Sequence, residues 1–250
     1  MAQLDVDDLM LCVSGIGSTN TIEEKRVYVP GEECLACLND LQRYLRRDNP
    51  KEMAAHKQLG EWAVAKMHLL PMLLSQAHDG RLVFNLLKIL VKLTMPIPPE
   101  AADARLQDAI DAHKEAFAAC PDAVRVIMRL LVDPLRRSAS GGAEAESENV
   151  FIELVLTLFR NLMHTPPPDS SPPGAAQAHA FRQSLGAHAR ILAVLEAEDV
   201  LEVVLYVTQL LSESSATRSW NLMLLEVVYC IVSFTEPDDC LLYTSPSPRD

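Results

Sequence analysis

Residues 82–93 read Leu82-Val83-Phe84-Asn85-Leu86-Leu87-Lys88-Ile89-Leu90-Val91-Lys92-Leu93. Seven apolar positions of this stretch return at the same offsets in residues 151–162 and again in residues 223–234. In a helix of about 3.6 residues per turn these offsets cover more than one narrow stripe, so each copy needs neighbours on several sides. Recurrence of such a helix predicts stacked helical units, an architecture that binds and scaffolds more often than it catalyses.

The composition favours a helical chain with a large core. Of the 250 residues 49% are hydrophobic and only 5% are aromatic, and strand-favouring residues are scarce beside Leu, Ala and Glu. This balance predicts an all-α fold. A chain of this length can bury enough apolar surface to need neither disulfides nor a structural metal.

Charge and cysteine usage narrow the class of protein. The formal net charge of −12 disfavours nucleic-acid binding by overall charge, because such binding needs basic surface to displace phosphate counterions. The six cysteines are scattered, and the N-terminus is acidic and lacks the features of a signal peptide. No apolar run reaches the roughly 18 residues of a membrane span. These features predict an intracellular protein with reduced thiols that does not cross a membrane.

The sequence divides into three parts. Residues 1–30 predict a short N-terminal helix and a loop. Residues 31–240 predict a helical repeat domain, interrupted at 138–148 and 165–174 by insertions that are too polar and too rich in Ser, Gly or Pro to pack, and are therefore predicted to be disordered. The apolar helix recurs after 69 and then 72 residues. Since an ordinary armadillo or HEAT unit has about 40–47 residues, each interval is expected to hold a helical unit plus an insertion.

The last ten residues, 241–250, differ in character from the rest. They have no helical period and follow the third apolar helix abruptly. They resemble endings found in translations of assembled transcripts that retain adapter sequence. We expect them to be a non-native tail, and the chain to be truncated near residues 236–240.

No set of residues predicts an active site, a cofactor site or a metal site. Cys34-Leu35-Ala36-Cys37 has the C-x-x-C spacing, but it lacks a second pair of ligands and lies in an amphipathic helix, so we interpret it as two packed thiols. Gly15-Ile16-Gly17 lacks the third glycine and the preceding strand of a dinucleotide-binding fingerprint. The seven histidines are dispersed. We therefore expect neither an enzyme nor a cofactor.

Four ordered segments stand out beside the apolar helix. They are Leu69-Leu70-Pro71-Met72-Leu73, Ile89-Leu90-Val91-Lys92-Leu93-Thr94-Met95-Pro96, Lys114-Glu115-Ala116-Phe117 and Arg160-Asn161-Leu162-Met163-His164-Thr165-Pro166. In order and spacing they resemble the N-terminal domain of the Timeless family, over residues 35–236. The chain departs from the family pattern at Lys92, where Asn is expected.

The resemblance implies an α-solenoid of armadillo- or HEAT-like repeats in a non-enzymatic nuclear scaffold of the replication fork protection complex. Such a scaffold stabilises paused forks and supports the S-phase checkpoint. The implied partners are a Tipin-type protein, the replicative helicase and other fork proteins, and double-stranded DNA.

Contact with DNA would need local positive surface on this acidic chain. The candidates are Arg43, Arg46, Arg47 and Lys51, with Lys88 and Lys92 as lesser ones. The alternative interpretation of these clusters is a solvated helix face or helix C-terminus.

A second hypothesis places the chain in another class. It would be an armadillo-like adaptor for peptides or proteins outside replication, as in the circadian clock of the insect branch of the family. Solenoids present concave grooves to extended ligands, which suits such an adaptor. The third hypothesis is an enzyme, and it ranks last because no residue stands out as a catalytic candidate.

Overall fold

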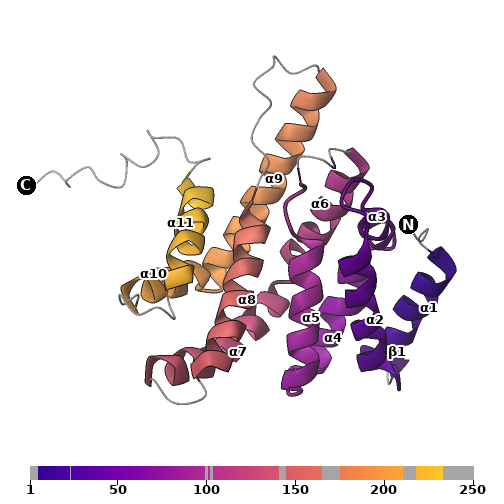
Figure 1. Ribbon diagram of the computed structural model, residues 1–250, viewed down its shortest axis with the longest axis horizontal. Coiled ribbons are helices and arrows are strands. Elements are labelled where there is room, and N and C mark those ends of the chain that lie inside the picture. The colour runs from indigo at the N-terminus through magenta and orange to yellow at the C-terminus, as the bar shows by residue number, and fades with distance from the viewer. Residues whose placement is uncertain are drawn as a thin grey trace, which may run out of the picture.

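The computed structural model consists almost entirely of helices (Figure 1). It describes residues 5–22, 24–98, 101, 104–140, 145–164, 175–210 and 218–232. The predicted all-α class is confirmed apart from one β-hairpin, whereas the assignment of armadillo or HEAT repeats stays a prediction. Among the described residues, no helix has both the length and the apolar character needed to cross a membrane.

The chain begins with α1 (Val6–Ile16) and a hairpin of β1 (Gly17–Ile22) and β2 (Lys25–Pro30). A π-helix, η1 (Ala65–Leu69), interrupts the α-helices that follow. These are α2 (Cys34–Arg47), α3 (Ala54–Glu61), α4 (Leu70–Ser75), α5 (Gly80–Leu93), α6 (Ala104–Ala118), α7 (Pro121–Ser140), α8 (Ala145–Met163), α9 (Ala175–Ala197), α10 (Val200–Leu210) and α11 (Arg218–Val232).

The hairpin replaces the loop predicted within residues 1–30. Its strands are antiparallel, with Gly17 opposite Pro30 and Ile22 opposite Lys25. Strand β2 alternates as a half-buried strand should, because Tyr28 is buried while the residues on either side of it are exposed. The alternation covers too few residues to be distinguished from a loop in the sequence alone.

Helices at intervals of three along the chain pack side by side. One row contains α2, α5, α8 and α11, a second contains α3, α6 and α9, and α4 packs against α7. Helix α1 extends the first row beyond α2, so that the rows run from the N-terminal to the C-terminal end of the molecule (Figure 1). This packing explains the long interval between the copies of the apolar helix, because each interval holds three helices.

The three copies of the apolar pattern form successive layers of the first row. All seven apolar positions are buried in α5, and six of the seven are buried in α8, which packs between α5 and α11. Helix α11 buries Met223, Leu224, Val227 and Cys230, but Leu225 and Tyr229 are 64% and 67% exposed. Leu225 and Tyr229 lie outside the apolar pattern, and the described pattern positions of α11 are buried or half-buried. The expectation that each copy is covered on several sides therefore holds for α5 and α8, while α11 has one exposed face.

The first predicted insertion is shorter than the sequence indicated. Residues 138–140 continue α7 and residues 145–148 begin α8. The Ser138 hydroxyl donates a hydrogen bond to the side-chain oxygen of Asn149 at 2.6 Å, and Arg137 forms an ion pair with Glu148 at 2.7 Å. These side chains connect the end of α7 to the start of α8. The other predicted insertion, 165–174, and the predicted tail, 241–250, lie outside the described residues.

Candidate functional site

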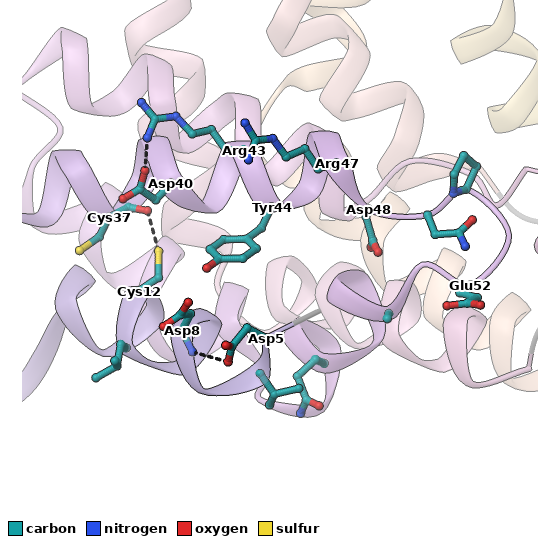
Figure 2. Close-up of a pocket in the computed structure, with 16 residues that line it drawn as sticks. Asp5, Asp8, Cys12, Cys37, Asp40, Arg43, Tyr44, Arg47, Asp48 and Glu52 are labelled. Atoms are coloured by element: carbon teal, nitrogen blue, oxygen red, sulfur yellow. Dashed lines mark hydrogen bonds and ion pairs between the residues drawn. The ribbon is translucent and has the colours of Figure 1, made fainter. Parts of the chain in front are cut away.

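A groove of about 1250 Å³ lies between α1 and α2 and continues onto the turn that leads into α3 (Figure 2). Local sequence explains both walls. Asp5 caps α1 by accepting hydrogen bonds from the backbone N–H groups of Asp7 and Asp8, at 3.1 and 3.2 Å. Helix α2 buries Leu38, Leu41 and Leu45 on its core side, which leaves its polar side chains for the groove and the solvent.

Acidic side chains dominate the groove. Its lining includes the carboxylates of Asp5, Asp8, Asp40, Asp48 and Glu52, against the two guanidinium groups of Arg43 and Arg47. Figure 2 shows both arginines extending along α2 away from α1, whereas Tyr44 points toward α1. Carboxylates therefore dominate the space between α1 and α2, because the two guanidinium groups point out of it.

Two of these carboxylates are already paired within the chain. Asp40 forms an ion pair with Arg43, one turn away on the same helix. Asp48 contacts the His56 ring at 2.8 Å, and both side chains are nearly inaccessible. Burial by itself would raise the pKa of Asp48, but the hydrogen bonds from His56 outweigh burial and the net pKa is lowered. The pair fixes the turn between α2 and α3 at one end of the groove.

The inner wall of the groove contains an aromatic ring and two thiols. The pKa of Tyr44 is raised, first by loss of solvent and then by the nearby charge of Asp8. Cys12 donates a hydrogen bond to the backbone oxygen of Cys37 at 3.0 Å, and burial raises the pKa of Cys12 to about 12. Because the thiolate is the reactive form, Cys12 is a packing residue at neutral pH.

The interpretation of Cys34 and Cys37 as packed thiols is confirmed. Both are free cysteines that lie partly buried against the core. Within the ranges that the structure describes, no three His, Cys, Asp or Glu side chains are placed to hold a metal ion.

The six candidate DNA-contacting residues fall into separate places. Arg43 and Arg47 line the groove, and Arg46 and Lys51 are exposed close by. Lys88 and Lys92 lie one turn apart on α5, where the Lys88 amine sits 4.1 Å from the centre of the Phe84 ring. The structure thus groups the first four around the end of α2, next to carboxylates that the sequence-based prediction did not consider.

A second group of polar residues lies between the stacked layers. Asn161 of α8 is fully buried, and its amide donates to the backbone oxygen of Val91 near the end of α5, at 3.1 Å. Arg160 donates to the Asn161 side-chain oxygen at 2.9 Å and pairs with Glu226 of α11 at 3.2 Å. Two neighbouring residues of α8 thereby connect three layers.

Lys114 of α6 makes a similar contact. Its ammonium group donates to the backbone oxygen of His164, just beyond the end of α8, at 2.5 Å. Burial lowers the pKa of Lys114 to about 8. A cation at this place also suits the negative end of the helix dipole. The segments around Lys114 and Asn161, which first suggested a family, therefore hold the helices together.

The comparison with protein families decides the question of kinship. The model described as "Timeless protein" matches residues 27–249, most of the chain. The chain belongs to the Timeless family. Relatives of this family include the protein timeless homologs of mouse, 27% identical over 82% of this chain, and of man, 26% identical over 86%.

A further Timeless relative comes from a fungus. The mating-type switching protein swi1 of Schizosaccharomyces pombe is 27% identical over 60% of this chain. The matched regions make up 17%, 18% and 17% of the mouse, human and yeast proteins. The chain thus spans less than a fifth of the length of these relatives.

Sequence reasoning missed the acidic character of the groove. Its carboxylates come from α1, from α2 and from the turn before α3, and no spacing in the sequence brings them together. One available signal was the run of acidic residues at the start of the first helix, Asp5, Asp7 and Asp8. In the sequence this acidic run argued only against a signal peptide.

Proposed function

We propose that this chain is part of a non-enzymatic nuclear scaffold in the replication fork protection complex. The observation that carries the proposal is membership of the Timeless family over residues 27–249. The scaffold stabilises paused forks and supports the S-phase checkpoint, through a Tipin-type partner, the replicative helicase and double-stranded DNA.

The packing of the helices supports a scaffold. Helices that pack in rows form a body whose sides can carry several partners at once. Asn161 and Arg160 fix the layers through directional hydrogen bonds, so the spacing of surface features is set by the core. Such a body suits a protein that holds other proteins at defined distances.

The kinship favours replication over the clock adaptor. One relative comes from a fission yeast and is named for mating-type switching. A family with a yeast member is not confined to the circadian clock of insects. The fork protection role is therefore the preferred proposal for this chain.

The test is association with the replicative helicase in cells. The complete gene product, tagged at its own locus, should co-precipitate helicase subunits from cells in S phase and from nuclease-treated extracts. It should be recovered from the nucleus. Absence of helicase subunits in S phase, or strictly cytoplasmic recovery with daily cycling of its level, would contradict the proposal and favour the adaptor.

A further inference from the structure

The groove between α1 and α2 combines unpaired negative charge with exposed apolar surface. Among the described residues, the side chains of Asp8 and Glu52 form neither an ion pair nor a hydrogen bond, although both line the groove. Leu11 and Val6 of α1 line the same groove and are 70% and 42% exposed. Carboxylates and apolar groups therefore face one open space.

The two arginines of the lining add little positive charge to the interior of the groove. Arg43 is neutralised by Asp40, and both Arg43 and Arg47 extend away from α1 (Figure 2). Tyr44, between them in sequence, instead turns its ring toward α1. The interior of the groove thus offers an aromatic face with carboxylates around it, and the positive groups stand at its outer edge.

We propose that this groove binds a short basic segment of a partner protein, with Lys or Arg side chains against Asp8 and Glu52 and an apolar side chain against Tyr44 and Leu11. Opposite charges steer and orient such a segment, while the aromatic and apolar contacts supply the buried surface. The proposal rests on the proposed scaffold function, because it names the chemistry of one partner of that scaffold.

Nucleic acid is the rival occupant, and the groove disfavours it. A phosphate backbone inside the groove would face the carboxylates of Asp5, Asp8 and Glu52, with the two guanidinium groups only at the outer edge. Binding to phosphates gains its free energy from basic side chains that release counterions, and here carboxylates are in the majority. DNA contact by the exposed Arg46 and Lys51 needs none of this interior surface.

The experiment measures binding of defined peptides to the purified chain by fluorescence anisotropy. The probe is a fluorescein-labelled peptide of sequence Lys-Arg-Leu-Lys-Arg. Matched probes replace Leu by Gly, or replace every basic residue by Glu. We expect saturable binding of the first probe, several-fold weaker binding of the glycine probe and no binding of the acidic probe. Equal binding of the basic and acidic probes, or no saturation, would overturn the proposal.

Variants place the binding in the groove. Asp8→Asn combined with Glu52→Gln should lower the affinity for the basic probe about fivefold to tenfold, since each exposed ion pair contributes a modest free energy of binding. Leu11→Ser should lower the affinity for the basic probe without changing the dependence of that affinity on salt concentration. The control with the same change of charge is Asp7→Asn combined with Glu32→Gln, two exposed residues outside the groove lining. The proposal fails if both double variants weaken binding equally.

Two further measurements separate the possible failures. A labelled DNA duplex should not compete with the basic probe, and full competition would assign the groove to nucleic acid and overturn the proposal. Helicase association in cells is scored independently. If that association is present and the peptide does not bind, only the groove proposal falls. If the peptide binds and the association is absent, the fork protection function falls and the groove proposal stands.

Discussion

Asn161 makes the buried side-chain hydrogen bond that joins α8 to α5. Replacing it with Ala removes the donor to the Val91 oxygen and the acceptor for Arg160, in a site without solvent. The Thr94 hydroxyl also lies 3.3 Å from the Val91 oxygen, so the substitution removes one of the two hydrogen bonds to that carbonyl, together with the charged one from Arg160. We therefore expect Asn161→Ala to lower the free energy of unfolding by about 2 kcal/mol. Urea titration followed by circular dichroism measures this change.

The matched control is Asn221→Ala on α11, where the side chain is exposed. It should change the free energy of unfolding by less than about 0.5 kcal/mol. Equal effects of the two substitutions would show that the Asn161 contacts do not hold the layers together.

His113 links stability to pH. It is buried in α6, and neither ring nitrogen has a hydrogen-bond partner among the described residues. Burial, followed by the nearby His56, lowers its pKa from 6.5 to about 4. Between these values the unfolded state binds the proton and the folded state does not, so His113 makes unfolding easier as the pH falls through this window.

His113→Leu should therefore stabilise the chain and reduce this loss. We expect a gain of about 1–2 kcal/mol at neutral pH, since a buried polar group without a partner is replaced by an apolar one. The gain should grow between pH 6.5 and pH 4. Urea titrations at several pH values measure it, with the exposed His78→Leu as control. A constant difference across the pH range would contradict this reading of His113.

At the scale of elements, the contact of α3 with α6 depends on Gly60. A Cβ atom at this position would overlap the Cβ and Cα atoms of Ala109, so the two helices approach more closely than side chains normally allow. Gly60→Ala should lower the free energy of unfolding by about 1–3 kcal/mol, because the helices must separate.

Gly80→Ala supplies the comparison for the same chemical change. Gly80 opens α5, and an added Cβ atom would meet no atom of the described residues within 4 Å. Since Ala favours helix, this change should be neutral or stabilising by up to about 1 kcal/mol. Thermal unfolding measures both variants. A destabilisation by Gly80→Ala as large as that by Gly60→Ala would refute the packing explanation.

Elements with a long apolar period were predictable, and short ones were not. Helices α5, α8 and α11 follow from their repeated pattern, because helical spacing places the apolar positions toward neighbours. The hairpin at residues 17–30 was missed, since its pairing is decided by contacts across the turn and by packing. The π-helix at residues 65–69 gives no periodic signal of its own.

At the scale of the whole molecule, the proposed DNA contact would need a small positive area on an acidic protein. Replacing Arg43, Arg46, Arg47 and Lys51 with Glu should weaken duplex binding and flatten its dependence on salt. Each lost phosphate contact reduces the slope of log K against log salt by about 0.9. Fluorescence anisotropy with a labelled duplex at several salt concentrations measures the slope.

The control for this charge reversal carries the same four changes elsewhere. Suitable exposed residues are Arg81, Arg105, Arg129 and Arg136. This control should lower the affinity for the duplex only through the more negative net charge of the chain. A slope unchanged by the first set, or changed equally by both sets, would remove the end of α2 from the candidate DNA surface.

The sequence alone determined the helical class, the stacked apolar helices and the kinship of this chain. These properties depend on patterns along the chain, namely the period of the apolar residues and the spacing of the ordered segments, which can be read from the sequence. Only the tertiary structure decided which residues meet. It brought Asn161 to Val91, and it enclosed acidic residues of α1 and α2 in one groove. Charges distant in the chain act together only once packing has fixed their separation, so no local pattern could have revealed the groove.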